Sequence, residues 1–487
     1  MLNHNLAEKA GASLHQSEEI ANKKLSVWEK AAYGSGDLAI NFYWSTVMTY
    51  MLFFYTDVVK IPAAIVGTMF LIVRILDGFV DLSMGVIIDR TQTRWGKLRP
   101  FILFGALPMA VVGVLCFSSP DFGMTGKVIY AYITYIAIMV MMSFIGTPYG
   151  ALTSAMTQNP LERVNLSSYR IVGSMIGGII VSVMTPIIIQ QFWPNDMSVG
   201  YRNTMIIYSL FALVFYMICF AGTKERAAAQ EAVKLPFKQS MKIIFTNKPL
   251  MLITFIYLVF QAAYGIKASV SIYYVNYNMN KTEFLSIYML LIFGSNLLGT
   301  LIAPKFTKWF EKKYAIIVGL TGTVISGIAL YFTDYSNVPM ILLWTVVGGL
   351  IGGIPAAVIW GALPDTVEYS EWKNGYRTEG LIYGIFSFGQ KLSIAISGAL
   401  SGYILQVSGY VPNAIQSSSA LNGIALLLCL LPAGLCAMGI IATLFYNLDS
   451  KTFSTIIMEL NGQKHLQRSK KNNNIKLVKR GLDQDVD

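Results

Sequence analysis

The sequence predicts an all-α polytopic membrane protein with twelve transmembrane helices, and three observations carry this prediction. The 487 residues are 54% hydrophobic and 13% charged, with a mean hydropathy of +0.54, far from the balance of a soluble protein. Apolar runs long enough to cross roughly 30 Å of hydrocarbon, at about 1.5 Å per residue, recur along the whole chain. Lysine and arginine are concentrated in every second connection between these runs.

The hydrophilic stretch at residues 223–248 divides the expected helices into two sets of six. A weak internal repeat agrees with two halves, because a basic turn and a new apolar run follow both the second and the eighth span. The expected units are a tail (1–30), a six-helix bundle (31–222), a linker (223–246), a second bundle (247–446) and a basic tail (447–487). The expected spans are 34–56, 62–88, 100–118, 128–148, 170–191, 204–222, 247–275, 284–303, 314–332, 338–363, 380–407 and 421–446.

The distribution of basic residues predicts the orientation of the chain. Loops rich in lysine and arginine stay in the cytoplasm. With the N-terminus inside, thirty basic residues fall on cytoplasmic segments and four on outside loops. Both termini are therefore expected in the cytoplasm of a multi-pass protein of the cell membrane. The net charge of +11 follows from this topology and requires no nucleic-acid partner.

The cysteines and histidines exclude several kinds of site. The three histidines, His4, His15 and His465, lie in the tails, which excludes a histidine proton relay or a histidine metal site in the membrane. The four cysteines lie inside expected spans, so we expect packing residues and no disulfide framework or metal centre. No HExxH motif, Gly-x-Ser-x-Gly elbow or Cys/His pair appears, so we expect neither an enzyme nor a cofactor.

Charged residues inside the expected spans indicate a functional cavity. Each costs at least a few kcal/mol at bilayer depth unless it is paired or hydrated, so such residues usually mark a site. The charged residues in the spans are Asp37, Arg74, Asp77, Asp81, Lys267 and Lys391.

The stretch IVRILDGFVDL holds three of these charges at spacing i, i+3, i+7, which places Arg74, Asp77 and Asp81 on one helix face. Two carboxylates one turn apart repel each other, and burial raises the affinity of at least one of them for a cation. Either a proton or Na⁺ would satisfy the pair. The alternative is a static brace in which Arg74 neutralises one aspartate and Lys391 or another cation neutralises the other.

Aromatic side chains give a softer signal for sugar binding. We single out Trp44, Tyr149 and Trp360, which could stack on a pyranose ring; Tyr149 lies between Pro148 and Gly150, and Trp360 precedes Gly361. The alternative is that they serve as packing residues or interface anchors.

Five stretches of the sequence together form a recognisable pattern. The longest is YTDVVKIPAAIVGTMFLIVRILDGFVDLSMGVIIDRTQTRWGKLRPFILFG at 55–105, and the others are YGSGDLAINF (33–42), TPYGALTSAMTQNP (147–160), PDTVEYSEWKNGYRTEGLIYGIFSF (364–388) and SGYVPN (408–413). They closely resemble the glycoside-pentoside-hexuronide:cation symporters of the major facilitator superfamily, the group that contains melibiose permease and the glucuronide carriers. The resemblance implies two pseudo-symmetric six-helix bundles and a sugar symporter that works by alternating access.

The resemblance also implies roles for individual residues. Asp77 and Asp81 fall on the cation-binding aspartates of the family, and Ser143 on a sodium-ligating threonine. Arg170 falls on the arginine that opens the fifth helix, and Lys391 on the lysine of the eleventh helix that lies near both the cation site and the sugar site. The region between the tenth and eleventh helices resembles a cytoplasmic gate, with Asp365, Glu368, Glu371, Arg377 and Glu379.

Departures from the melibiose pattern refine the expected substrate and ion. Asn41 and Gly146 replace two sugar-binding aspartates, and the region from Trp360 looks more like the glucuronide and pentoside carriers. Val80 replaces a polar residue just before the second aspartate, which favours H⁺ over Na⁺ as the coupling ion.

Lys267 is the remaining intramembrane charge. The three intramembrane cations and three acids balance before a coupling ion enters, so a proton or Na⁺ would leave one positive charge to attract an anionic sugar. The alternative is that Lys267 pairs with a carboxylate of a neighbouring helix.

The expected function is import of a glycoside by symport with H⁺ or Na⁺, carried out by a monomer in the lipid bilayer. The substrate-binding candidates are Asn41, Trp44, Arg74, Tyr149, Arg170, Lys267, Trp360 and Lys391. A membrane sugar sensor without transport activity and a lipid carrier of the same superfamily are the alternatives. A sensor should carry an added soluble domain, for which the two tails are too short.

Overall fold

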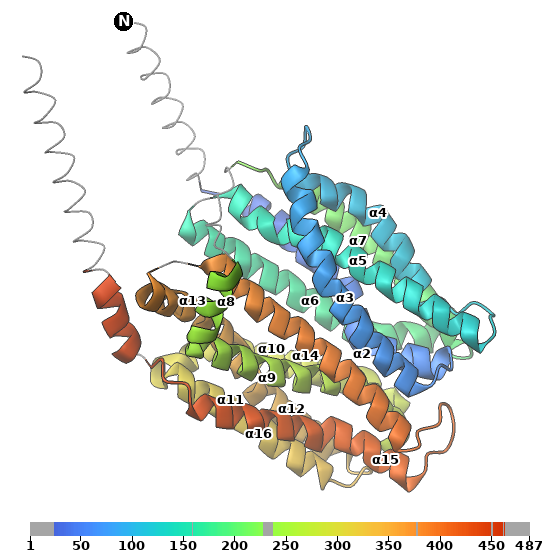
Figure 1. The fold of residues 1–487 in the computed structure, drawn as a ribbon. Coiled ribbons are helices and arrows are strands. Elements are labelled where there is room, and N and C mark those ends of the chain that lie inside the picture. Colours follow the sequence, from blue (N-terminus) through green and yellow to red (C-terminus); the bar gives the residue numbers. More distant parts are fainter. Residues whose placement is uncertain are drawn as a thin grey trace, which may run out of the picture.

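A computed structural model describes residues 24–157, 159–226, 237–375, 378–449, 451–460 and 462. These residues form a long bundle of α-helices and contain no β-strand (Figure 1). Arg377, the three histidines, residues 227–236 of the expected linker and most of both expected tails lie outside the described residues.

The membrane-spanning helices agree with the predicted fold class. Within the described ranges, ten stretches are long and apolar enough to cross a bilayer. Two further helices, α2 and α14, have 27 and 29 residues, and both carry charged residues of the candidate site. The α-helices are α2 (Val27–Phe53), α3 (Ala63–Arg90), α4 (Arg99–Cys116), α5 (Met124–Met156), α6 (Pro160–Phe192), α7 (Met197–Gly222), α8 (Phe237–Thr246), α9 (Lys248–Tyr273), α10 (Leu285–Trp309), α11 (Lys312–Tyr331), α12 (Val338–Gly352), α13 (Ile354–Asn374), α14 (Glu379–Val407), α15 (Ser418–Ala425) and α16 (Leu431–Leu444).

The helices gather into two bundles that lie side by side. Helices α2 to α7, blue to green in Figure 1, form the first bundle, and α9 to α16, green to red, form the second. The bundles meet where α3 packs on α14, α2 on α9, and α6 on α10. We call the end where α2 begins, α16 ends and α8 lies the terminal face, and the opposite end the distal face.

Several helices extend beyond the predicted spans, and for two of them the local reason is clear. Helix α2 begins seven residues before the expected span because Ser26 and Glu29 form a capping box, which satisfies backbone N–H groups at the helix start. The expected span 338–363 is interrupted at Gly353 and continues to Asn374. Pro355 follows in the first turn of α13, where its missing N–H is tolerated.

The first helix of each bundle ends in the same way at the distal face. A π-helical turn follows α2 at Phe54–Val58 and follows α9 at Tyr274–Asn278. In each case the second residue after the turn has a left-handed backbone, Lys60 with φ of 67° and Asn280 with φ of 51°. This repeated helix end is a stronger internal symmetry than the basic loops noted in the sequence.

A cluster that we call the distal lock joins the bundles at the distal face. Asp57 of the first bundle is buried and accepts hydrogen bonds from the hydroxyls of Tyr277 and Tyr410 in the second. The side chain of Asn413 donates to the Asp57 carbonyl oxygen at 2.7 Å. Thr56 and Tyr273 share a further hydroxyl hydrogen bond of 2.6 Å across the interface.

Close backbone packing accompanies the distal lock. A Cβ atom built on Gly402 of α14 would lie 2.5 Å from the carbonyl oxygen of Ala63 and 2.8 Å from the backbone of Gly67, both at the start of α3. Only glycine fits this contact, which closes the distal half of the interface.

The terminal half of the interface is open. On α3, α5, α13 and α14, a group of glycines near this face has no atom within 4 Å of a built Cβ; its members are Gly78, Gly146, Gly150, Gly361, Gly380 and Gly384. Two ion pairs at the terminal face, Lys30 with Glu162 at 2.8 Å and Lys312 with Asp365 at 2.5 Å, each stay within one bundle.

Candidate functional site

The charged face of α3 meets Lys391 of α14 at the interface between the bundles. The Lys391 Nζ lies 2.9 Å from Asp77 Oδ2 and also forms an ion pair with Asp81. It donates to the backbone carbonyl of Asp77 at 3.4 Å. Asp77 is buried, whereas 37% of the Asp81 side chain is exposed. One lysine of the second bundle is thus shared by two carboxylates of the first.

Two hydroxyl groups on α5 complete this charged cluster. The Ser143 hydroxyl donates to Asp77 Oδ1 at 2.9 Å, and the Thr147 hydroxyl lies 3.4 Å from Asp81 Oδ1. Sequence reasoning identified Ser143 and missed Thr147, although the two are four residues apart and therefore share a helix face. Each aspartate has one hydroxyl neighbour.

This arrangement can exchange one cation for another. The Lys391 ammonium contacts one oxygen of each carboxylate and the Asp77 carbonyl, and the Ser143 and Thr147 hydroxyls lie next to the other carboxylate oxygens. A monovalent cation entering between the carboxylates would compete with Lys391, and a proton on either carboxylate would weaken its hold on the lysine. The observed ion pairs also resemble the static brace, in which a separate cation neutralises each aspartate, except that Lys391 here pairs with both aspartates. Arg74 lies 3.9 Å from Asp77.

Arg74 is buried between the aspartates and the central cavity. Its guanidinium lies 4.9 Å from the ring centre of Trp44, and its Nη2 lies 3.9 Å from the Met48 sulfur. Trp44 and Met48 also line the cavity, so Arg74 connects the charged cluster to the cavity wall.

The central cavity lies between the bundles and has a volume of about 200 Å³. Its first-bundle wall includes Asn41, whose amide donates to Ser174 Oγ at 2.8 Å and to the Asp37 carbonyl at 2.9 Å. Its second-bundle wall includes Gln261, Tyr264 and Asn296. The lining therefore combines aromatic side chains, Trp44 on one side and Tyr264 and Phe293 on the other, with polar groups on both sides.

Asp37 and Arg170 form an ion pair in the first bundle that sequence reasoning did not predict. The Arg170 Nε lies 2.5 Å from Asp37 Oδ2, and the guanidinium lies 4.8 Å from the ring centre of Tyr149. Tyr149 is buried against Gly36 and donates to the Tyr33 carbonyl at 2.7 Å. Neither Tyr149 nor Arg170 lines the central cavity. Tyr149 supports Arg170, which keeps about a third of its side chain exposed.

Two further predicted substrate residues also lie away from the cavity. The Trp360 ring packs within the second bundle, 4.9 Å from the ring centre of Phe386 and 6.0 Å from that of Tyr257. Lys267 projects into a separate pocket inside the second bundle.

The predicted gate residues lie near the terminal face, on α13 and at the start of α14. Asp365 pairs with Lys312 of α11, a contact that the sequence did not indicate. Glu368 and Glu371 follow on α13, and Glu379 is the first residue of α14. Arg377 lies outside the described residues.

Comparison with known proteins adds to this geometry. Residues 32–450 match the family described as MFS/sugar transport protein. The chain is 36% identical to the isoprimeverose transporter of Lactiplantibacillus pentosus, over 96% of this chain and 98% of that protein. It is 33% identical to the glucuronide carrier protein homolog of Escherichia coli K12, over 92% and 98%.

Among solved structures, the fold is similar to a bacterial homolog of the human lysosomal transporter Spinster in an inward-facing, unoccupied conformation. The TM-score is 0.67 at 14% identity, and the match covers 89% of this chain and 99% of that one. This likeness supports the two-bundle transporter fold.

Proposed function

Because the chain belongs to the MFS/sugar transport protein family, we propose that it imports a glycoside by symport with a monovalent cation. The resemblance to glycoside-pentoside-hexuronide:cation symporters is confirmed by the family match and by the relatives of known substrate class. The relatives are transporters, which also confirms that the protein is not an enzyme.

The observation that carries the proposal is the sharing of Lys391 by Asp77 and Asp81 beside the cavity. A coupling cation that reaches the two aspartates releases Lys391 from part of its pairing. The released ammonium can then donate to a sugar hydroxyl or acid group, which links ion binding to sugar binding. We favour H⁺ over Na⁺, because Lys391 already fills the space between the carboxylates and a proton needs only one oxygen.

Alternating access follows from the contrast between the two faces. Since the terminal face carries the basic residues expected inside, we assign it to the cytoplasm. The closed distal lock and the open terminal half then correspond to a conformation that releases sugar and cation into the cell. The pathway lies between the two bundles of one chain, so a monomer suffices.

The lining of the cavity supports a sugar as the substrate. Trp44 offers an aromatic face for a pyranose ring, and Asn41, Gln261 and Asn296 offer amides for hydroxyl groups. The relatives named for isoprimeverose and glucuronide point to a pentoside, a glucuronide or a related sugar.

A second candidate is a carrier of amphipathic molecules such as lipids, and one observation favours it. A crevice of about 360 Å³ between α3 and α14 is lined by apolar side chains, including Phe79 and Phe388, and reaches Arg74 and Lys391. If lipids were the substrate, Phe79→Ala should abolish transport, whereas sugar uptake should tolerate it. Parallel assays of labelled phospholipid exchange and labelled glycoside uptake in proteoliposomes would separate these functions.

The first test is the external pH of energy-depleted cells in weak buffer after a pulse of β-glucuronides, xylosides or galactosides. Sugar-specific alkalinisation without Na⁺ is the expected result, because an imported proton leaves the medium. Labelled uptake that appears only with Na⁺, without alkalinisation, would contradict the choice of H⁺. Absence of uptake of every glycoside under both conditions would overturn sugar symport.

Lys391→Ala should weaken sugar binding and ion binding together. Loss of one charge-assisted hydrogen bond costs about 1.5–3 kcal/mol, so the half-saturating sugar concentration should rise at least about tenfold. Counterflow of labelled sugar, measured over a range of pH values and Na⁺ concentrations, would report the changes in sugar affinity and in ion affinity. Lys391→Arg is the charge-conserving control. Unchanged sugar affinity in Lys391→Ala would contradict the link between the two sites.

A further inference from the structure

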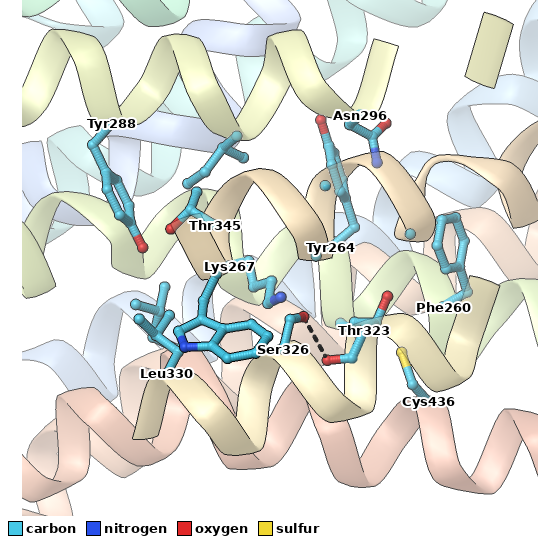
Figure 2. Close-up of a pocket in the computed structure, with 17 residues that line it drawn as sticks. Phe260, Tyr264, Lys267, Tyr288, Asn296, Thr323, Ser326, Leu330, Thr345 and Cys436 are labelled. Carbon is cyan, nitrogen blue, oxygen red and sulfur yellow. Dashed lines mark hydrogen bonds between the residues drawn. The ribbon is translucent and has the colours of Figure 1, made fainter. Parts of the chain in front are cut away.

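The second bundle contains a pocket around Lys267 that the proposed transport cycle does not use (Figure 2). The pocket has a volume of about 60 Å³ and lies among α9, α10, α11, α12 and α16. Figure 2 shows the Lys267 amine turned toward Ser326 and Thr323, with Tyr264 and Asn296 on the opposite side. The lysine therefore points into an internal space within the bundle.

Lys267 has no counter-charge in this pocket. No aspartate or glutamate lines it, and in the part of the chain that the structure describes Lys267 forms no ion pair. The expected alternative, a carboxylate from a neighbouring helix, is therefore not found. An ammonium group in such surroundings is costly unless an opposite charge accompanies it.

The hydroxyl groups nearest to Lys267 can solvate its charge but cannot neutralise it. Ser326 donates to the Thr323 carbonyl at 3.1 Å, and Thr323 donates to the Gly319 carbonyl at 3.2 Å. Their protons are thus engaged within α11, and only their lone pairs can face the lysine.

Other lining groups offer free hydrogen-bond donors. Within the described residues, the Tyr264 hydroxyl, the Asn296 amide and the Trp344 indole N–H have no protein hydrogen-bond partner. Together with Lys267 they line a space that has donors and positive charge but no acid, which is the chemistry of an anion site.

We propose that the Lys267 pocket binds a singly charged anionic group. Its volume suits a halide ion or a carboxylate and is too small for a sugar ring. Two sources share this chemistry: a free inorganic anion such as chloride, and the acid group of a transported sugar. The second source rests on the proposed function, and Tyr264 and Asn296 line both this pocket and the central cavity.

The test is the thermal unfolding midpoint of the purified full-length protein in detergent, titrated with chloride or bromide. Sulfate balances the ionic strength, and Na⁺ is held constant. Binding to the folded state should raise the midpoint in a saturable way. Lys267→Met should lose this response, whereas Lys127→Met, which removes a lysine near the distal face, should keep it.

A matched pair of sugars separates the two sources. If the acid group of the sugar occupies the pocket, a glucuronide should raise the unfolding midpoint and compete with chloride. The glucoside of the same aglycone should do neither. A response to chloride alone identifies a resident inorganic anion and stands even if no glycoside is transported. Uptake of a neutral glycoside, measured separately, tests the proposed function itself.

Two results would overturn the site. One is an equal anion response in Lys267→Met and the wild type, and the other is the absence of any response in the wild type. Should Lys267→Met fail to fold, crystals of the wild type soaked in bromide decide the question. An anomalous peak within hydrogen-bond reach of the Lys267 amine is expected, and its absence would contradict the site.

Discussion

Asp77→Asn is expected to abolish accumulation of the sugar against a gradient while leaving exchange of sugar across the membrane in place. Asparagine keeps the shape and can still accept the Ser143 hydrogen bond, but it carries no charge for a cation or for Lys391. Because the coupling ion then gains nothing from binding, its gradient cannot drive uptake. The intracellular sugar should not exceed the external concentration.

The measurement is the steady-state level of labelled sugar in energised cells, with counterflow in de-energised vesicles as the test of exchange. Asp121→Asn, in an exposed loop, serves as the matched control and should behave like the wild type. Full concentrative uptake by Asp77→Asn would leave the charged cluster as a static brace and remove its coupling role.

Gly402→Val is expected to reduce transport by at least about tenfold, because it prevents closure of the distal face. A Cβ atom at this position would meet the backbone of Ala63 and Gly67 at 2.5–2.8 Å. Backbone atoms cannot rotate away as side chains can, so α3 and α14 must separate. The variant should therefore favour a conformation open at the distal face.

Two readouts test this expectation together. Initial uptake rates report turnover, and a cysteine introduced in place of Ser45 on the cavity wall reports access to membrane-impermeant thiol reagents from outside. Labelling should become faster in Gly402→Val than in the parent. Gly434→Val on α16, where a Cβ meets nothing within 4 Å, is the matched control. Normal uptake with unchanged labelling would show that the distal contact does not govern access.

The charge cluster was accessible to sequence reasoning because helix periodicity alone places Arg74, Asp77 and Asp81 on one face. Helix periodicity gives no information about Lys391, since 310 positions separate it from Asp81; its charge made it one possible partner of the aspartates, and the resemblance then implied that it lies near the cation and sugar sites. The pairing of Asp37 with Arg170 was missed because it depends on how α2 packs against α6, and periodicity within one helix carries no information about that contact.

The aromatic predictions show the limit of residue type as a guide. Trp44, Tyr149 and Trp360 are all large aromatic residues inside expected spans, yet of the three only Trp44 lines the cavity. Tyr149 is enclosed because Gly36 leaves room for its ring, and Trp360 turns to Phe386. Which side a ring faces depends on the neighbouring helix, whose position the sequence pattern did not specify.

The glycines at the terminal face have a consequence for the conformation that this structure does not adopt. Gly78, Gly146, Gly361 and Gly384 border empty space, and glycine in a helix costs roughly 0.5–1 kcal/mol relative to alanine. In this conformation no close packing contact at these glycines offsets that cost. At the opposite end, Gly67 and Gly402 show what such residues permit, which is direct contact between backbones. The chain thus has glycines suited to close backbone packing at both ends of the interface between the bundles. Because the two ends do not close together, any single conformation leaves one of these sets unused.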